Sequence, residues 1–155
     1  MNRRSMLIVT TAGVAFAGNA VAQQPSDIDG VKAASKAFYA ALAVIDNGEA
    51  MAKVWAQTPY VTMVGPRSKS ILVGFEALKK YWPEANKPFA SRNVSLVDAH
   101  IHVNGNLAWE IGHETGDTKM KDGTVRKTDW IATNVYEKID GRWLMVSHHV
   151  QPKPQ

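Results

Sequence analysis

The sequence predicts an α+β fold in which helices come first and an antiparallel sheet follows. In this chain of 155 residues, helical spacing of apolar residues ends before residue 93, and four long strand-like runs fill most of the sequence that follows. Each break between these runs holds a glycine beside Asn or Asp, which is typical of hairpin turns. Because a hairpin sheet can bury one face under helices, we expect the helices to pack on one face of the sheet.

The first helix is expected over residues 28–46. Asp27 or Asp29 is expected as its N-cap, because a short acidic side chain can accept a hydrogen bond from the first free backbone N–H groups. Its apolar residues recur three or four positions apart, as one buried helix face requires, at Val31, Ala34, Phe38, Ala41, Leu42 and Ile45.

Two further helices and two short strands are expected before the long runs. The second helix is expected over 49–57 and the third over 74–85, where Pro83 should limit it. Extended segments at 60–64 and 70–74 are bounded by Gly and Pro and are expected to be short strands. The long strands are expected at 93–105, 107–120, 124–139 and 142–151.

The turns between the last three strands decide which residues share a face. Both turns carry an Asp-Gly pair, at Asp122-Gly123 and Asp140-Gly141, which can form a two-residue type I′ turn or a three-residue loop. With three-residue loops, even-numbered positions of all three strands lie on one face. With two-residue turns at both pairs, Asn134 would move to the face opposite Glu114 and His148.

The even face mixes carboxylates, an amide, an imidazole and aromatic rings, as the walls of ligand pockets do. Its members include Glu110, Glu114, Trp130, Asn134, Tyr136 and His148. The odd face holds large apolar residues and is expected to be a dimer surface. Its members include Trp109, Ile111, Trp143, Met145 and His149.

Composition narrows the class of protein. The chain is 45% hydrophobic and 21% charged, the balance of a globular domain with a real core. It has no cysteine, which excludes disulfides, cysteine nucleophiles and cysteine-ligated metals. Loss of residues 1–22, which hold Arg3 and Arg4 but no acid, would take the formal charge from +4 to +2. That small charge predicts no nucleic-acid partner.

Residues 1–22 are expected to be a signal peptide. They combine a basic start, an apolar run and the motif Ala20-Val21-Ala22, which suits a cleavage site. The run is shorter than the roughly 20 residues that a membrane-spanning helix needs. Residues 23–155 would then be one exported domain, periplasmic or extracellular and free of the membrane. The paired arginines fit a twin-arginine or a general secretory route.

Several motifs, in order, resemble the SnoaL-like branch of the nuclear-transport-factor-2-like superfamily over residues 28–152. They include "LVGFEAL", "DAHIHV", "LAWEIGHETG" and "TNVYEKIDGRWLMVSHH". The closest pattern is the association domain of calcium/calmodulin-dependent protein kinase II. The resemblance implies a cone-shaped, curved antiparallel sheet wrapped around N-terminal helices, a pocket inside the cone and dimerisation through the outer sheet face. The superfamily holds both enzymes and assembly domains, so the fold assigns no reaction.

The resemblance also limits the mechanism. The pocket-lining arginines of the association domain align with Glu114, Asn134 and Val150, so an anionic ligand held as in that domain is not expected. In ketosteroid isomerases the residue before a proline supplies a carboxylate base, but Gly65 stands there in this chain. Tyr39 lies next to the position of the isomerase tyrosine acid. The isomerase mechanism is therefore not carried over.

The candidate catalytic residues are Glu114 and His148, with Glu110 as an alternative carboxylate. A carboxylate inside an apolar cone has a raised pKa and can serve as acid or base. In the competing interpretation, both glutamates lie at solvent-exposed strand ends and His148 is a core residue. The expected ligand-binding residues are Tyr39, Trp55, Glu110, Glu114, Trp130, Asn134, Tyr136 and His148.

The predicted function is therefore binding of a small, largely apolar molecule by an exported homodimer, with isomerase-, dehydratase- or hydrolase-like acid–base chemistry left open. The alternative is a non-catalytic dimerisation, assembly or accessory domain. No cofactor is expected, and the pair His100 and His102 is expected to be structural or interfacial, not a metal site. An accessible cavity of several hundred Å³ lined by His148 and a glutamate would favour ligand binding.

Overall fold

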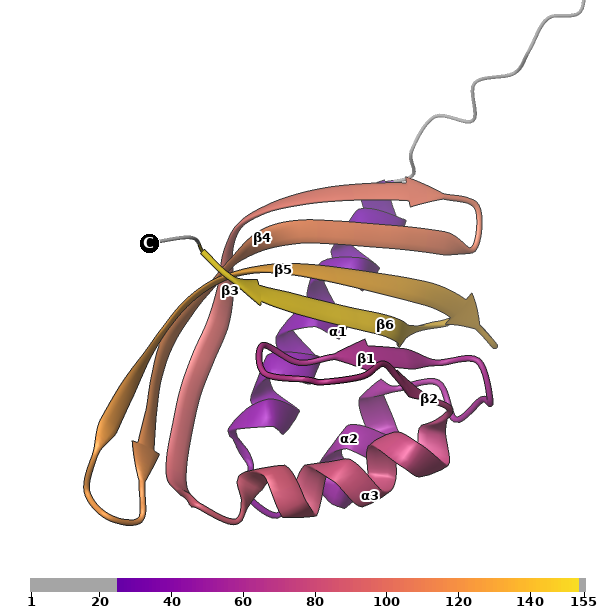
Figure 1. Ribbon diagram of the computed structural model, residues 1–155. Helices are drawn as coiled ribbons and strands as arrows, with labels where there is room; N and C mark the ends of the chain where they lie inside the picture. Colours follow the sequence, from indigo (N-terminus) through magenta and orange to yellow (C-terminus); the bar gives the residue numbers. More distant parts are fainter. Residues whose placement is uncertain (1–24, 154–155) are drawn as a thin grey trace, which may run out of the picture.

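The computed structural model describes residues 25–153, which form three helices and a curved, unclosed sheet of six strands (Figure 1). The predicted signal peptide lies outside the described residues and stays a prediction. Within residues 25–153 no helix is long and apolar enough to cross a membrane. The elements are α1 (Pro25–Ala43), α2 (Gly48–Val54), β1 (Thr62–Val64), β2 (Leu72–Val73), α3 (Phe75–Asn86), β3 (Phe89–Asn104), β4 (Leu107–Met120), β5 (Val125–Ile139) and β6 (Arg142–Pro152).

The α+β prediction is confirmed, with one correction to the sheet. The strand order is β2-β1-β6-β5-β4-β3, and β1 runs parallel to β6, so the sheet is mixed and not purely antiparallel. The reason is the connection. Strands β3 to β6 follow one another through short turns, which impose antiparallel pairing, whereas β1 and β6 are far apart in the chain and no turn constrains their direction.

Helix α1 lies against the concave face of the sheet, where it contacts β3 and β6 (Figure 1). It begins at Pro25, earlier than expected, because proline suits the first turn of a helix, where its missing N–H costs nothing. Asp27 and Asp29 therefore lie inside the helix and are not N-caps. Asp27 instead pairs with the Lys138 ammonium at 2.5 Å, which ties the start of α1 to β5.

Helix α3 continues past Pro83, which was expected to limit it. Proline removes one helical hydrogen bond, but the last turn is held by contacts of its final residue. The Asn86 amide donates to the Ile45 carbonyl at 3.0 Å, and Arg92 donates to Asn86 Oδ1 at 3.2 Å. These contacts fix the end of α3 against the rest of the fold.

Two irregularities bend the long hairpin of β3 and β4. A bulge in β3 carries Asp98 at φ 52°, and in β4 Gly116 adopts φ 141°. A side chain at Gly116 would place its Cβ 2.0 Å from the Asn93 carbonyl oxygen, so only glycine fits there. The close approach and the bulge let the strands curve around α1.

The two Asp-Gly turns differ. Residues 121–123 form a three-residue loop in which Gly123 has φ 89°, whereas Asp140-Gly141 is a two-residue turn with φ 50° and 77°. By itself, the two-residue turn would place even positions of β5 and odd positions of β6 on the same face. An extra residue in β6, Val146, moves the even positions after it back to the face of the even positions of β5. Asn134 therefore pairs with His148, and both side chains are buried.

The bulge at Val146 also overturns two odd-face assignments. Trp143 and Met145 precede it, so their side chains turn into the core and cannot form an outer interface. Trp143 packs so closely on α1 that a Cβ at Gly30 would lie 2.7 Å from its ring. The other odd-face residues named above, including Trp109 and Ile111, remain on the outside.

Candidate functional site

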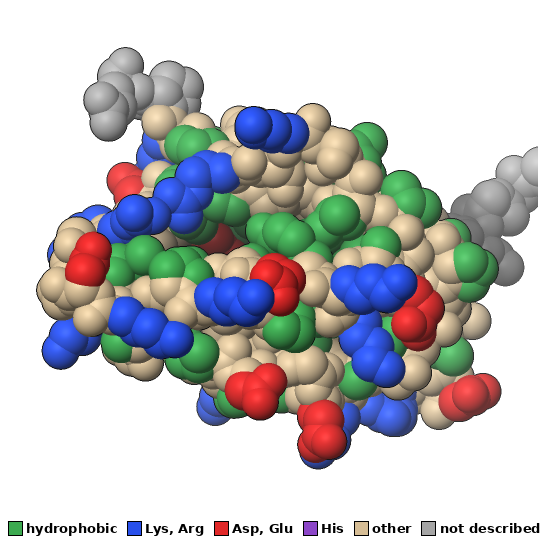
Figure 2. Space-filling model, turned by 60° about the horizontal axis from the view of Figure 1, so that its bottom comes forward, with side chains coloured by type: hydrophobic (Ala, Val, Ile, Leu, Met, Phe, Trp, Pro, Cys, Tyr) green, Lys and Arg blue, Asp and Glu red, His purple; other side chains and the backbone are tan. Residues whose placement is uncertain are grey.

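A cavity of about 660 Å³ opens on the concave side of the sheet, next to α3. Figure 2 shows this side hollowed, with hydrophobic and basic side chains bordering the hollow. Its apolar walls come from α1, β1, α3 and the sheet, at Phe38, Leu42, Met63, Tyr81, Trp82, Phe89, Val94, Trp130 and Val150. The volume falls within the range of small-molecule pockets.

The structure divides the sequence-predicted site residues among three places. Glu114, Trp130 and His148 line the large cavity. Tyr39 and Glu110 line a second pocket of about 300 Å³ between α1 and β3. The remaining three, Trp55, Asn134 and Tyr136, are buried in the core and line neither pocket.

A hydrogen-bonded chain lies behind His148 and orients its ring. The Tyr136 hydroxyl donates to Glu110 Oε1 at 2.6 Å, and the Asn134 amide nitrogen donates to the same oxygen at 2.8 Å. The amide oxygen of Asn134 lies 2.6 Å from His148 Nδ1. Because that oxygen can only accept, Nδ1 carries the proton and Nε2 is left with a free lone pair.

His148 stays neutral over the physiological range. Burial and, to a smaller extent, the charge of the neighbouring His149 together lower its pKa to about 3. A histidine with so low a pKa is a weak base. It is well suited to accept a hydrogen bond from a ligand at a fixed position, because the ring is held by Asn134 and packs on Phe38, 5.0 Å away between centroids.

Glu114 is the group that can exchange a proton near neutral pH. Burial raises its pKa, the nearby Tyr39 hydroxyl and the charge of Arg92 lower it in part, and the resulting value is about 7. Its Oε1 is buried and has no hydrogen-bond partner among residues 25–153. The carboxyl group therefore titrates much closer to neutral pH than an ordinary glutamate and keeps one oxygen available to a ligand.

Tyr39 joins the carboxyl group to the hydrogen-bonded chain. Burial and the nearby Glu114 charge raise the pKa of its hydroxyl far above the usual value, so the hydroxyl keeps its proton. Its oxygen lies 3.4 Å from the donating amide nitrogen of Asn134, and the hydroxyl and the Glu114 carboxyl group each shift the pKa of the other. Residues that line different pockets thus belong to one polar network.

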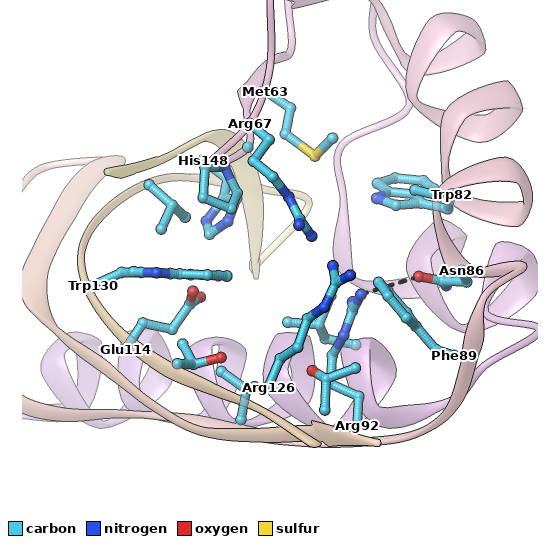
Figure 3. A pocket seen from close by; sticks show the side chains of 18 of the residues that line it. Met63, Arg67, Trp82, Asn86, Phe89, Arg92, Glu114, Arg126, Trp130 and His148 are labelled. Atoms are coloured by element: carbon cyan, nitrogen blue, oxygen red, sulfur yellow. Dashed lines mark hydrogen bonds between the residues drawn. The ribbon is translucent and has the colours of Figure 1, made fainter. Parts of the chain in front are cut away.

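The cavity residues that the sequence did not predict include all three of its arginines, Arg67, Arg92 and Arg126. Figure 3 shows their guanidinium groups pointing into the cavity from different walls, with Glu114, Trp130 and His148 at another side. For Arg126 a signal was present, because it occupies an even position of β5, two residues before the buried Thr128. Arg67 follows β1 in a loop, where no periodic pattern applies.

The two histidines of β3 lie away from the cavity. His100 and His102 are exposed, and the His102 ring stacks on Trp109 with centroids 4.2 Å apart. No group of three histidine or acidic side chains suitable for a metal ion occurs in the part of the chain that the structure describes.

Several solved structures share this fold. A proposed dehydratase of the NTF2-like family from Streptomyces avermitilis is 21% identical, with a TM-score of 0.74, covering 84% of this chain and 98% of its own. A proposed calcium/calmodulin-dependent protein kinase type II association domain from Thiobacillus denitrificans is 27% identical, with a TM-score of 0.67, covering 79% and 94%. A proposed scytalone dehydratase from Novosphingobium aromaticivorans is 12% identical, with a TM-score of 0.73, covering 83% and 85%.

The sequence comparisons decide the family. No curated protein sequence matches the chain significantly. The family model of the SnoaL-like domain matches residues 31–151, which is most of the chain. The resemblance seen in the sequence motifs is thereby confirmed: the chain belongs to the SnoaL-like domain family and has structural neighbours in the NTF2-like superfamily.

Proposed function

We propose that the protein binds a small, largely apolar molecule in the 660 Å³ cavity and acts on it by acid–base chemistry. The observation that carries the proposal is the presence of both Glu114 and His148 in the wall of one accessible cavity. Aromatic side chains form much of the remaining wall, as the binding of an apolar molecule requires.

The two polar groups have different roles in this proposal. Glu114, with a pKa of about 7, transfers the proton, because a group that titrates near the working pH can both take and give one. His148 Nε2 accepts a hydrogen bond from a ligand hydroxyl and orients it. This arrangement suits isomerase-, dehydratase- or hydrolase-like reactions. Two neighbouring structures are themselves proposed dehydratases, which supports the same class.

Binding of 2-naphthol tests the proposal, because this probe has an apolar body and one hydroxyl donor. Isothermal titration calorimetry of the full-length chain should give saturable binding. His148→Ala should weaken it about tenfold, the value of one hydrogen bond. His149→Ala is the matched control: His149 is exposed on the opposite face of the sheet, so its loss should leave 2-naphthol binding unchanged. No saturable binding, or equal loss in both variants, would contradict the proposal.

A second candidate function is association of two copies through the outer sheet face. Trp109 and Ile111 on β4 are 39% and 42% exposed, and the apolar Val97 and Leu107 are exposed on the same hairpin. Association domains among the structural neighbours favour a second copy as the occupant of this face. Such a role is compatible with ligand binding, because the cavity lies on the other side of the sheet.

Trp109→Lys should abolish this dimer. A lysine placed at the centre of an apolar contact would have to lose water without a partner. Sedimentation velocity at micromolar concentration should show a dimer for the unmodified chain and a monomer for the variant. Ile71→Lys is the control, because Ile71 is 63% exposed and lies outside the outer sheet face, just before β2. A monomeric unmodified chain would end this candidate.

A further inference from the structure

Arginine is concentrated in the cavity. Residues 25–153 contain four arginines, at positions 67, 92, 126 and 142, and the first three line the cavity. They come from the loop after β1, from β3 and from β5, so they are not neighbours in the chain. Figure 3 shows the Arg67 and Arg126 side chains reaching toward each other from opposite walls, with Arg92 beside them.

The sheet register brings two of them together. Arg92 on β3 pairs with Thr118 on β4, and Thr118 pairs with Arg126 on β5. The two arginines therefore flank one threonine across three strands and project from the same face, with backbones roughly 10 Å apart at ordinary strand spacing. Thr118 is buried and lines the cavity between them. Side chains as long as arginine can meet over it.

No ion pair involves these arginines in the described part of the chain, and Glu114 acts on Arg92 only through its charge. Arg92 is held in place by neutral groups: it donates to Asn86 Oδ1 at 3.2 Å and lies 4.5 Å from the centroid of the Phe89 ring. By contrast, Lys127 at the same cavity has a partner, Asp117, at 3.6 Å.

Glu114 cannot balance these charges alone. It is the single acid among the described residues of the cavity wall, and it faces three guanidinium groups. Guanidinium groups that converge without an anion repel one another, and each presents N–H donors that match the two oxygens of a carboxylate. An anionic group supplied by the ligand would relieve the repulsion and use the donors.

We propose that the ligand of this cavity is an apolar carboxylic acid whose carboxylate binds Arg67, Arg92 and Arg126 while its apolar body reaches toward Glu114 and His148. This inference rests on the proposed function, because it concerns the same cavity. It differs from the anion site of the association domain, whose aligned positions Glu114, Asn134 and Val150 carry no arginine here. The guanidinium groups point inward, which favours a small molecule over a polyanionic surface.

A pair of probes with the same shape tests the proposal: 2-naphthoate, which is anionic, and 2-naphthamide, its neutral counterpart. Calorimetry on the full-length chain at pH 7 should show at least tenfold tighter binding of 2-naphthoate. Added salt should weaken 2-naphthoate binding and leave 2-naphthamide binding unchanged, because only the first depends on charge.

Single substitutions locate the anion site. Arg92→Gln and Arg126→Gln should each weaken 2-naphthoate binding five- to tenfold and leave 2-naphthamide binding unchanged. Arg142→Gln is the matched control, because Arg142 is exposed, contacts the Lys53 carbonyl and lies outside the cavity. Arg126 is exposed, so its substitution remains informative even where loss of Arg92 impairs folding.

The outcomes separate the two proposals. Equal affinity for both probes, or a preference for 2-naphthoate that survives both cavity substitutions, would overturn the carboxylate site and leave the proposed small-molecule function standing. Failure of 2-naphthol and of both naphthalene probes to bind would overturn the proposed function together with this inference. Loss of the preference in the cavity variants but not in Arg142→Gln would support the carboxylate site.

Discussion

Gly116→Ala is expected to lower the free energy of unfolding by about 3–5 kcal/mol, the sum of backbone strain and overpacking. Gly116 has φ 141°, which side-chain-bearing residues rarely adopt, and the added Cβ would lie 2.0 Å from the Asn93 carbonyl oxygen. That oxygen belongs to the backbone of β3 and cannot rotate away. Denaturation by urea, followed by tryptophan fluorescence, measures the loss.

Gly48→Ala is the matched control for this effect. Gly48 begins α2, a Cβ added there would have no atom within 4 Å, and alanine favours helix. The stability of this variant should equal or slightly exceed that of the unmodified chain. A Gly116→Ala protein within about 1 kcal/mol of the unmodified chain, by the scale of ordinary substitutions, would refute the claim that this close approach creates the bend.

Glu114→Gln should change the free energy of unfolding differently at alkaline and at acid pH. Measured against the unmodified chain, the variant should gain about 3 kcal/mol more at alkaline pH than at acid pH. The pKa of Glu114 is about 7 in the folded chain and 4.5 as its ordinary value, and this difference sets the magnitude. Between these pH values the folded state binds more protons than the unfolded state, so the unmodified chain loses stability as pH rises. Glutamine does not titrate and removes that loss.

The variant should also reveal the opposite slope of His148. Its folded pKa of about 3 lies below the ordinary 6.5, so its contribution is present above pH 6.5 and is lost as pH falls toward 3. In the unmodified chain the two slopes oppose each other between pH 4.5 and 6.5. In Glu114→Gln, stability should therefore rise with pH across that window. A difference between the two proteins that stays constant from about pH 4 to pH 8 would show that Glu114 is not buried as described.

The residues on the inner face of β4 and β5 were predictable, because successive side chains there point to opposite faces without interruption by a bulge between the two strands. Glu110 and Glu114 share a face with Trp130 and Asn134, since the loop between these strands has the three residues assumed. In β6 the alternation breaks down over residues 143–146, which are all apolar. Such a run does not show which residue is the extra one, so the bulge at Val146 and the burial of neighbouring side chains could not be predicted.

The basic part of the cavity depends on contacts between distant segments. Arg92 becomes a cavity residue because β3 pairs with β4 in a register that includes two shifts, one between Phe89 and Ser91 and one between Val97 and His100. Arg67 becomes a cavity residue because the loop after β1, a strand that pairs with β6, lines the cavity. A single sequence carries no signal for such contacts. Aligning the arginines of a related domain also misses them, because here the positive charge comes from other positions.

A crystal structure of the full-length chain with 2-naphthol tests most directly whether the cavity is a ligand site. We expect the naphthalene ring inside the cavity, near Trp130, with its hydroxyl within hydrogen-bond distance of His148 Nε2 and with Glu114 beside it. Density for the probe on the outer sheet face, with the cavity filled by its own side chains, would contradict the account.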